Sequence, residues 1–586
     1  MTAIAPFDNI IAREGTLVNI LRWRAAAHPD RVAFRFLADG ETESGCLTYA
    51  QLDCQARTIA VALARRCQPG DRVLLLYPPG LEFISAFFGC LYAGVVAVPL
   101  YCPRFNRNDP RVQAVTANSE AAFALTTADL LGKMEKQLHQ TPYLQQVVRM
   151  ATDDLDAGLA DKWVPPAISN DTLAFLQYTS GSTSIPRGVM VTHGNLIANE
   201  EMIRQAFEWH EKSVVVSWLP IYHDMGLIGN TLQPIYAGIP CVQMPPASFL
   251  QYPHLWLSAV TKYKGTCIGA PNFAYDLCVR RVTPEQMASL DLSTVDLAYC
   301  GAEPIRATTL ESFSRTFGLA GFQPSAFYPC YGLAEVTLFG TGGRKADSPT
   351  VISVSADKLE GNQVEEVGLP FENTRMIVGC GRTWLDGQLI IVNPHSHELC
   401  SKDEVGEIWI SGNHVAQSYW NNTVDSGRVF NASLAADHSV QYLRTGDFGF
   451  IRRGELFVTG RLKDLIIIRG RNHYPQDIES SVLQSHSAVA QGRCAAFAAT
   501  GGEQEDLIVV AEMDRGHFAI DLDDLVARIR GAIVREHGLD PAKILLVRAR
   551  TLPVTTSGKI QRHACLIAYL CDKLDVLNTQ GVTEAR

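Results

Sequence analysis

The stretch YTSGSTSIPRG, residues 178–188, carries the strongest indication of fold and function in this sequence. It directly follows residues 173–176, an apolar segment typical of a strand. Its small residues let backbone N–H groups converge on an anion, while its hydroxyls and the guanidinium of Arg187 supply further donors to phosphate oxygens. The stretch suits a polyphosphate, although taken alone it is also compatible with an ordinary Ser/Thr/Gly-rich surface loop.

Five further short blocks follow this loop in order along the chain. They are residues 301–304 (GAEP), 331–335 (YGLAE), 445–447 (TGD), 460–464 (GRLKD) and 556–560 (TSGKI). With these companions the chain resembles the adenylate-forming superfamily of acyl-CoA synthetases, nonribosomal-peptide adenylation domains and luciferases. The resemblance spans nearly the whole chain and departs from the usual pattern in the phosphate loop, where Ser184 replaces a glycine and Arg187 a lysine.

These two departures keep a second class of protein open, namely a catalytically weakened acyl or nucleotide binder. Arginine still contacts phosphate, but its planar fork differs from an ammonium group. The presence of Glu335, Asp447, Arg461 and Lys559 favours an enzyme. An ordinary acyl-CoA synthetase is the other alternative, since it shares the first half-reaction and differs in its thiol acceptor.

The pattern along the rest of the chain indicates an α/β fold in two lobes. Between about residues 70 and 340, short β-rich apolar runs alternate with helix-like stretches. Residues 345–450 consist of short strands broken by Gly, Asn and Pro, including residues 388–392 and 406–411, which indicates a β-rich subdomain. We expect a large N-terminal adenylation lobe, residues 1–460, made of two α/β subdomains and this β-rich subdomain. A small mobile α+β C-terminal domain, residues 461–586, should follow a hinge at Lys463. Its pattern predicts helices at residues 476–484 and 522–537 and strands at residues 465–468, 494–499, 507–512 and 544–547.

The composition limits the kind of protein further. The chain has 586 residues, of which 47% are hydrophobic and 19% charged, as in ordinary globular enzymes. A net charge of -10 argues against a nucleic-acid partner, because such binding depends on neutralising phosphates with Lys and Arg. The fifteen cysteines are scattered singly without a C-x-x-C pair, which indicates reduced thiols and a cytoplasmic location.

Residues 83–102 form an uncharged, mostly apolar run that is long enough to span a bilayer. The run contains Gly89, Gly94 and Pro99 and follows a strand-like segment at residues 72–77. A buried strand–helix–strand unit therefore explains it better than a membrane span. We therefore expect no stable membrane insertion. Asp8 and Glu14 also stand where a secretory signal needs positive charge, so we expect no secretion.

The superfamily resemblance implies a role for each motif. Glu335 is expected to hold Mg²⁺, which prefers few carboxylates plus phosphates, and Asp447 to accept the ribose hydroxyls, with Arg461 nearby. Lys559 is expected to reach into the large-lobe site and bridge the substrate carboxylate and the α-phosphate of ATP. The catalytic residues expected are Lys559, His223 and Glu335. The nucleotide-binding residues expected are Thr179, Ser180, Gly181, Ser182, Thr183, Arg187, Gly301, Ala302, Glu303, Tyr331, Gly332, Asp447 and Arg461.

Three more blocks resemble the fatty acyl-AMP ligases in particular. They are residues 218–229 (WLPIYHDMGLIG), 269–275 (GAPNFAY) and 472–479 (NHYPQDIE). By this resemblance His223 lies near the acyl-adenylate, and Met225 and Ile228 begin the acyl tunnel. Residues 345–380 resemble the extra insertion of these ligases, although from composition alone they are only a polar loop region.

This resemblance implies ATP- and Mg²⁺-dependent activation of a medium- or long-chain fatty acid to acyl-AMP and pyrophosphate. The insertion would restrain domain movement and disfavour coenzyme A, so that the acyl group passes to the phosphopantetheine thiol of an acyl carrier protein. No Gly-x-Asp-Ser-Leu attachment site occurs in the chain, so the carrier should be a separate polypeptide. The candidates to bind this carrier protein are Arg528, Arg530, Arg548 and Arg550. Alternatively, these arginines are structural or simply solvated.

Cys330 has no evident base partner and is interpreted as a packed small hydrophobic residue.

Overall fold

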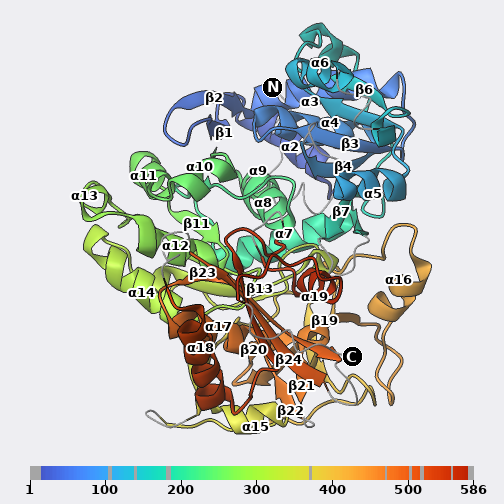
Figure 1. Cartoon of the computed structure of the whole chain (residues 1–586). Helices are drawn as coiled ribbons and strands as arrows, with labels where there is room; N and C mark the ends of the chain where they lie inside the picture. The colour runs from blue at the N-terminus through green and yellow to red at the C-terminus, as the bar shows by residue number, and fades with distance from the viewer. Residues whose placement is uncertain are drawn as a thin grey trace.

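The computed structural model describes residues 15–102, 109–136, 142–179, 186–368, 373–468, 471–500, 505–514, 520–555 and 559–578. Figure 1 shows two α/β layers in the N-terminal half, a β-rich part after them, and a small α+β part at the C-terminal end. This arrangement confirms the expected fold class.

The first layer is a six-stranded sheet. Its strands are β3 (Arg72–Tyr77), β4 (Val96–Tyr101), β5 (Phe123–Thr126), β6 (Val148–Ala151), β7 (Leu173–Thr179) and β8 (Arg187–Thr192). They lie in the order β6-β5-β3-β4-β7-β8, parallel throughout except for the antiparallel pair β7 and β8. The segment predicted to bind phosphate joins these two strands, and its residues 180–185 lie outside the described residues.

Helices cover this sheet and account for the long apolar run. They are α2 (Leu17–Ala27), α3 (Tyr49–Ala64), α4 (Leu81–Ala93), α5 (Pro110–Ser119) and α6 (Ala128–Lys136). The run at residues 83–102 forms most of α4 and all of β4, both largely buried. Gly89 lets α4 approach α3 closely, because a Cβ there would lie 2.5 Å from Ile59 Cγ2. The buried strand–helix–strand interpretation is confirmed, and no helix in the described ranges is long and apolar enough to cross a membrane.

The second layer is an eight-stranded sheet. Its strands are β1 (Val32–Leu37), β2 (Glu43–Thr48), β9 (Val215–Ser217), β10 (Cys241–Gln243), β11 (Cys267–Ala270), β12 (Leu297–Cys300), β13 (Phe327–Tyr331) and β14 (Thr341–Gly342). They lie in the order β14-β13-β12-β11-β9-β10-β1-β2, with antiparallel pairing only at the two ends. The blocks at residues 218–229 and 301–304 follow the carboxyl ends of β9 and β12, and the block at residues 331–335 begins with the last residue of β13. Open α/β sheets bind ligands at these carboxyl ends.

Helix α7 (His193–Phe207) ties this layer to later segments. It begins with a capping box in which Thr192 and Asn195 satisfy each other's backbone N–H groups. The Asn195 amide also donates to the carbonyl of Val415 at 2.9 Å, and Asn199 donates to the carbonyl of Phe339 at 2.7 Å. The other helices of the layer are α8 (Asp224–Leu227), the single π-helical turn η4 (Ile228–Leu232), α9 (Gln233–Ala237), α10 (Pro246–Gln251), α11 (His254–Tyr263), α12 (Asn272–Arg281), α13 (Pro284–Met287) and α14 (Ala307–Phe317).

The β-rich part is an antiparallel four-stranded sheet in sequence order, with one helix, α16 (Thr423–Phe430), between its second and third strands. The strands are β17 (Gln388–Val392), β18 (Gly406–Ser411), β19 (Leu443–Arg452) and β20 (Glu455–Arg461). The first two have the bounds that the sequence indicated.

The insertion at residues 345–380 is not a polar loop, and the interpretation from composition is wrong there. It forms β15 (Val351–Ser355), the short helix α15 (Ala356–Glu360) and β16 (Thr374–Val378), with the two strands paired antiparallel. Ile352 and Val354 of β15 and Ile377 of β16 pack into one buried cluster. The same cluster contains Phe448, Phe450 and Phe457 of the four-stranded sheet. In β15 the buried side chains alternate with more exposed ones, which is the period-two pattern of a strand with one buried face, and the short length of the run concealed it.

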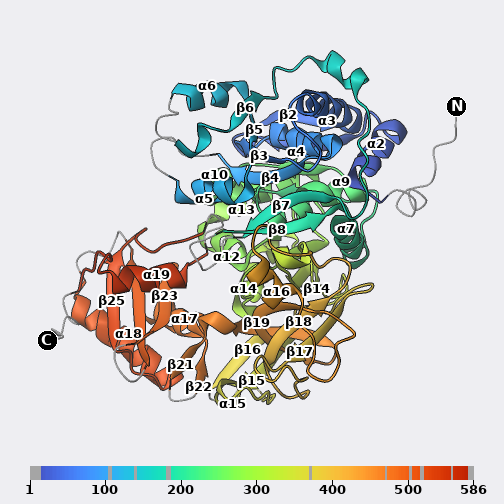
Figure 2. The same ribbon diagram turned by 90° about the vertical axis from the view of Figure 1, so that its right-hand side faces the viewer.

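The C-terminal α+β part has its own core, made only of residues beyond 465. Its elements are β21 (Ile466–Ile468), β22 (Arg471–His473), α17 (Pro475–Ser485), β23 (Val489–Thr500), β24 (Glu505–Met513), α18 (Leu522–His537), β25 (Lys543–Arg548) and α19 (Arg562–Leu570). Figure 2 shows this part beside the β-rich sheet. Helix α18 has the predicted bounds, whereas β22 and α19 were not predicted.

Candidate active site

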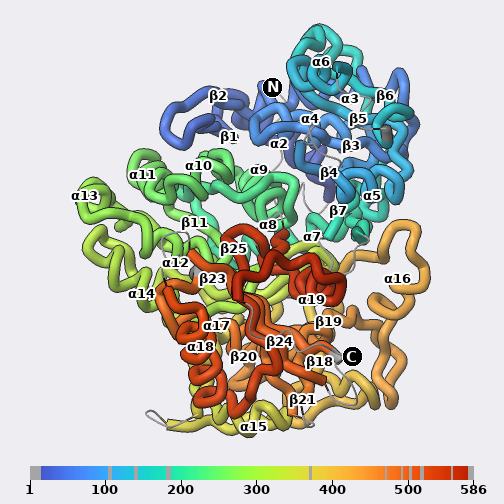
Figure 3. Tube along the Cα trace, viewed as in Figure 1, coloured from blue at the N-terminus to red at the C-terminus, as the bar shows by residue number. Residues whose placement is uncertain are grey.

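One cavity of about 500 Å³ collects most of the residues singled out in the sequence. Its wall combines the carboxyl ends of β12 and β13, the β7–β8 hairpin, the β-rich sheet and the C-terminal part. In Figure 3 the C-terminal segment before α19 lies across the middle of the molecule, which brings Lys559 to this wall. The predicted residues that line the cavity are Thr179, Arg187, His223, Met225, Gly301, Ala302, Tyr331, Gly332, Glu335, Asp447, Arg461, Lys463 and Lys559.

Asp447 stands at a corner of the cavity and is held on both sides. The Tyr331 hydroxyl donates to Asp447 Oδ2 at 2.8 Å, and Arg461 Nε lies 3.3 Å from Oδ1. The negative charge of Asp447 raises the pKa of Arg461 above its ordinary value. The pairing follows from the sheet, because β19 places Asp447 opposite Arg461 of β20. A fixed carboxylate of this kind can accept two hydrogen bonds from neighbouring hydroxyls.

Glu335 lies in a short turn that directly follows β13. The hydroxyl of Tyr419 donates to Glu335 Oε1 at 2.7 Å. Burial raises the pKa of Glu335 above its ordinary value, and the bond from Tyr419 acts in the opposite direction. A carboxylate beside phosphates is a hard oxygen ligand of the type that Mg²⁺ prefers, so Glu335 fits the role of a magnesium ligand.

Arg187 begins β8 at the exit of the phosphate loop. Its Nη2 forms an ion pair with Asp425 Oδ2 at 2.8 Å, and its guanidinium lies 5.3 Å from the ring centroid of Tyr419. Thr179, across the hairpin from Arg187, also lines the cavity. The predicted residues Ser180, Gly181, Ser182 and Thr183 fall outside the described residues.

The two glycine-bearing turns after β12 and β13 lie side by side at the sheet edge. Gly332 is required by its neighbours, because a Cβ there would overlap the carbonyl oxygen of Leu338. Ala302 adopts a left-handed conformation with φ 67°. Glu303 differs from the other predicted residues, since it does not line the cavity. Its carboxylate instead accepts a hydrogen bond from the backbone N–H of Phe273 at 2.6 Å, and burial raises its pKa.

Lys559 comes from the C-terminal part, in a turn closed by two hydrogen bonds with Thr555. Removal from water lowers the pKa of Lys559, and the charge of Arg461 lowers it further, while Glu303, Asp224 and Asp447 act to raise it. Lys463, the predicted hinge residue, lines the same cavity, and burial followed by Arg461 lowers its pKa as well. Cations therefore concentrate at one end of the cavity.

His223 and Asp224 stand between this charged end and an apolar end. The imidazole Nδ1 of His223 lies in direct contact with the carboxylate of Asp224. Burial alone would raise the pKa of Asp224, but the charges of His223 and Lys559 outweigh it and hold that pKa below the ordinary value. Met225 lines the cavity next to them, whereas Ile228 is fully buried in the core and its neighbour Gly229 lines the cavity instead.

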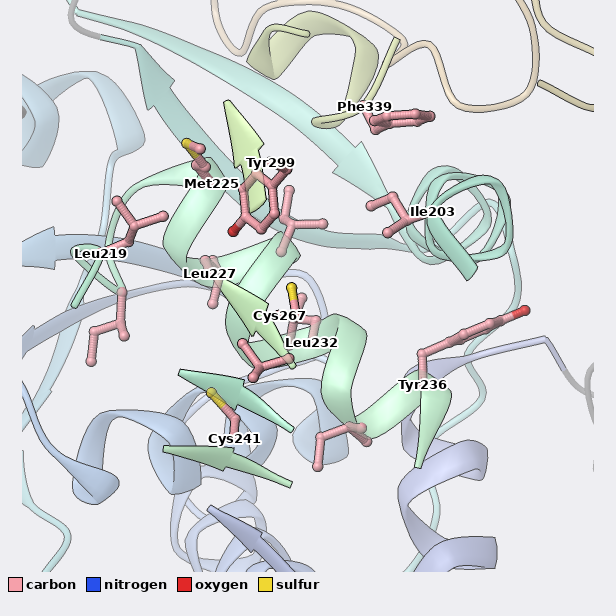
Figure 4. Packing of buried hydrophobic residues seen from close by; sticks show 14 of the residues in the cluster. Ile203, Leu219, Met225, Leu227, Leu232, Tyr236, Cys241, Cys267, Tyr299 and Phe339 are labelled. Carbon is pink, nitrogen blue, oxygen red and sulfur yellow. The ribbon is translucent and has the colours of Figure 1, made fainter. Parts of the chain in front are cut away.

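The apolar end contains residues that sequence reasoning missed. Ile203 and Phe207 come from α7, Tyr299 from β12, and Leu338 and Phe339 from the turn before β14. Figure 4 shows Met225 close to Tyr299, and Ile203 facing Phe339 across the packing. Tyr419, Asp224, Glu407, Arg428 and Arg444 were missed at the polar end. Apart from Asp224, which lies inside a quoted block, none carried a local signal, since folding alone brings them to the site.

Two other expectations concern residues of doubtful role. Burial raises the pKa of Cys330, whose thiol donates to the carbonyl of Cys300, so it has the character of a packed thiol rather than a nucleophile. Arg528, Arg530 and Arg548 form ion pairs with Asp524, Asp540 and Asp575 of the same domain. Their charges are thus partly compensated within the chain.

Comparisons with known proteins agree with this geometry. The family described as AMP-binding enzyme matches residues 21–420, and the family described as Disco-interacting protein 2-like, AMP domain, matches residues 463–579. The chain is 42% identical to the medium-chain-fatty-acid–[acyl-carrier-protein] ligase JamA of Moorena producens, over 96% of each chain. It is 36% identical to the long-chain-fatty-acid–AMP ligase FadD32 of Mycolicibacterium smegmatis, over 96% of this chain and 97% of the relative. The chain belongs to the fatty acyl-AMP ligases, within the AMP-binding enzymes.

A solved structure supports the same placement of this ligase. The fatty acyl-adenylate ligase of L. pneumophila, in complex with acyl adenylate and pyrophosphate, is 41% identical and superposes with a TM-score of 0.76. The match covers 95% of this ligase and 97% of the L. pneumophila chain. The family resemblance drawn from the motif blocks is therefore confirmed, and membership of an enzyme family counts against a mere acyl or nucleotide binder.

Proposed function

We propose that this ligase activates a medium- or long-chain fatty acid with ATP to acyl-AMP and pyrophosphate, and then transfers the acyl group to an acyl carrier protein. The observation that carries the proposal is that Lys559 of the C-terminal part lines the same cavity as Asp447 and Glu335 of the large lobe. One end of this cavity is cationic and the other apolar, as a fatty acid and a nucleotide together require. JamA is named as an acyl-carrier-protein ligase, which supports the carrier as acceptor.

In the first step a carboxylate oxygen of the fatty acid attacks the α-phosphorus of ATP. A new P–O bond forms, the bond from the α-phosphorus to the bridging oxygen breaks, and pyrophosphate leaves with the electron pair. When the carboxylate and the phosphate are about 4 Å apart, each pair of unit negative charges repels by about 4 kcal/mol at an effective dielectric constant of about 20. Lys559 offsets this repulsion, because its ammonium group interacts with both anions at once.

The nucleotide lies along the polar wall in this proposal. Asp447 accepts the ribose hydroxyls with Arg461 beside it, and the turns at Gly301–Ala302 and Tyr331–Gly332 hold the adenine. The hairpin loop with Thr179, Ser180, Gly181, Ser182 and Thr183 binds the phosphates, together with Arg187. Arg187 then exchanges its ion pair with Asp425 for phosphate oxygens. Glu303 contributes from behind the wall, by fixing the backbone of Phe273.

Glu335 would hold Mg²⁺ with the phosphates of ATP. The ion supplies charge neutralisation to the leaving pyrophosphate when it is bound. The protein's own contribution is to place the carboxylate. Tyr419 does so by donating to Glu335 Oε1, and its ring lies under the guanidinium of Arg187. Tyr419 therefore connects the proposed magnesium ligand and the proposed phosphate ligand.

In the second step the phosphopantetheine thiol, after losing its proton, attacks the acyl carbonyl, and AMP leaves. We propose that the C-terminal domain, residues 461–586, turns about the hinge at Lys463 between the two steps. Such a rotation needs large changes of φ and ψ at only a few hinge residues. The insertion at residues 345–380 contacts that domain through Glu360, which pairs with His473 at 3.0 Å, and Arg375, which pairs with Asp477 at 3.1 Å. These contacts support a restraint on domain movement that disfavours coenzyme A.

The experiment that tests the proposal is mass spectrometry of the products formed from ATP, Mg²⁺ and dodecanoic acid. The reaction is split between coenzyme A and a holo acyl carrier protein. Acyl-AMP with transfer to the carrier alone is the expected result. Efficient formation of acyl-CoA would assign the ligase to the acyl-CoA synthetase reaction, and no adenylate from any of several acids would overturn the proposal.

We also propose a cytoplasmic location for the reaction. The fifteen cysteines are all free thiols, which a reducing compartment maintains. Cell fractionation, with the ligase tracked by activity, tests this assignment.

A further inference from the structure

We infer that Tyr299 limits the length of the acyl chain that this ligase accepts, and that Gly229 keeps the space in front of Tyr299 open. The inference rests on the proposed function, because it concerns the chain of the fatty acid. It narrows the substrate class to medium-chain acids. Long-chain acids are rejected because the wall that Tyr299 forms leaves no room for the rest of their chain.

The apolar end of the cavity runs alongside the helix that begins at Asp224. Met225 and Gly229 both line the cavity. Met225 lies in α8, and Gly229 lies in the π-helical turn η4 that follows it. Leu232, the last residue of that turn, is fully buried and lies outside the wall of the cavity. The space for an acyl chain thus passes Met225 and Gly229 and does not reach Leu232.

Tyr299 borders this space opposite the π-helical turn, and two contacts fix it there. Its hydroxyl donates to Asn230 Oδ1 at 2.9 Å, and its ring stacks on Phe207 with centroids 5.5 Å apart. Gly269 makes room for the ring, since a Cβ at that position would overlap it. A ring held by stacking and by its hydroxyl cannot swing aside without loss of both contacts. It therefore acts as a rigid wall.

Gly229 faces the same space from the π-helical turn. A Cβ there would lie 3.2 Å from Leu338 Cδ2 and 3.7 Å from the Tyr299 hydroxyl oxygen. A larger side chain would fill the gap between these two residues. The π-helical turn thus contains both Gly229, which leaves the space open, and Asn230, which accepts the hydrogen bond that holds Tyr299. Such turns occur frequently at functional sites.

This geometry predicts a defined dependence on chain length. Each methylene that enters the apolar end strengthens binding about fourfold. Once the chain reaches Tyr299, a further methylene must displace the packed ring or remain in water. The kcat/KM of adenylation should rise along a series of saturated acids and then fall sharply.

The test measures fatty-acid-dependent pyrophosphate release with saturated acids from butanoic to hexadecanoic acid. With Gly229→Leu the preferred acid should become shorter, with a loss of about tenfold or more for the acid that the wild type prefers and little change for butanoic acid. With Tyr299→Leu the preferred acid should become longer. If Tyr299→Leu does not fold, as judged by thermal melting, the Gly229→Leu result decides.

Tyr328→Leu is the matched control. Tyr328 also packs on Phe207, with centroids 5.0 Å apart, but it does not line the cavity. Its replacement should lower the melting temperature without moving the preferred chain length. The inference is overturned if Gly229→Leu leaves the profile unchanged, if Tyr328→Leu moves it equally, or if the wild type accepts hexadecanoic acid as well as any shorter acid. A wild type that activates none of the acids would instead refute the proposed function itself.

Discussion

The two ends of the cavity are built by different means. At the polar end each acidic group has a partner at fixed distance, as with Tyr331 on Asp447 at 2.8 Å and Tyr419 on Glu335 at 2.7 Å. At the apolar end rings and aliphatic groups pack without such bonds, apart from the one that anchors Tyr299. Buried charges require partners, whereas apolar packing tolerates exchanges that conserve volume. The polar end should therefore respond to the loss of single atoms, and the apolar end to changes in volume.

The largest effect is expected for Lys559→Ala. Loss of the cation leaves the repulsion between carboxylate and phosphate uncompensated, so adenylation should slow by about a thousandfold. The melting temperature should hardly change. ATP–pyrophosphate exchange measures the rate, with Arg548→Ala as a control, since Arg548 is an exposed arginine of the same domain. An exchange rate within a few-fold of the wild type would refute the assigned role.

Asp447→Ala should have the next largest effect. It removes the acceptor proposed for the ribose hydroxyls and leaves Arg461 without its ion pair, so kcat/KM for ATP should fall by about a hundredfold. The KM for the fatty acid should stay the same, because the acid binds at the other end. Asp437→Ala, which removes an exposed aspartate of the same sheet region, serves as control. Equal changes in both KM values would contradict the separation of the two ends.

Tyr419→Phe removes a single oxygen atom from the polar end. It therefore tests most directly whether that end responds to the loss of single atoms. Loss of one hydrogen bond to a charged group should lower kcat by about tenfold and raise the Mg²⁺ concentration needed for half activity. Binding of Mg²⁺–pyrophosphate, measured by calorimetry, should weaken in parallel. Tyr328→Phe loses a hydroxyl that donates to the carbonyl of Gly343 away from the cavity, and should show neither change.

The smallest effect is expected for His414, a buried residue next to the polar end. His414 is fully buried, and its backbone carbonyl accepts a hydrogen bond from Thr337 near Glu335. Burial lowers the pKa of His414 to about 4. Between pH 4 and 6.5 the unfolded chain binds more protons at this site than the folded one, so stability falls as the pH falls through that window. The loss reaches about 3 kcal/mol near pH 4.

His414→Leu should flatten this dependence. Urea unfolding at several pH values measures it, and His193, whose pKa burial also lowers to about 4, contributes a similar slope that remains in the variant. An unchanged pH dependence in His414→Leu would show that His414 is not buried in its neutral form.

The same contrast explains what the sequence predicts and what it does not. Glu335, Asp447 and Lys559 lie in short blocks whose residues act together, and the cavity contains all three. Tyr419 and Tyr299 have no such local pattern, since their roles depend on strands and turns that meet only in the fold. Glu303 lies inside a block and yet faces the backbone of Phe273, because the turn after β12 directs its side chain away from the cavity.

The spacing of hydrophobic residues predicts the helices and strands of the fold where these elements are long or strongly patterned. Helix α18 and strands β17 and β18 have the bounds that their sequences indicated. The strands of the insertion were missed, since short runs such as Val351–Ser355 become strands only by packing on Phe448 and Phe450. Tertiary contacts supply the stability that local preference lacks there.

The measurement that most directly tests whether one cavity joins ATP to a fatty acid is ATP–pyrophosphate exchange by the wild-type ligase, with and without decanoic acid. Exchange that depends on the acid, and that needs neither carrier protein nor coenzyme A, is the predicted result. Exchange that is absent with every acid, or that proceeds equally without one, would contradict it.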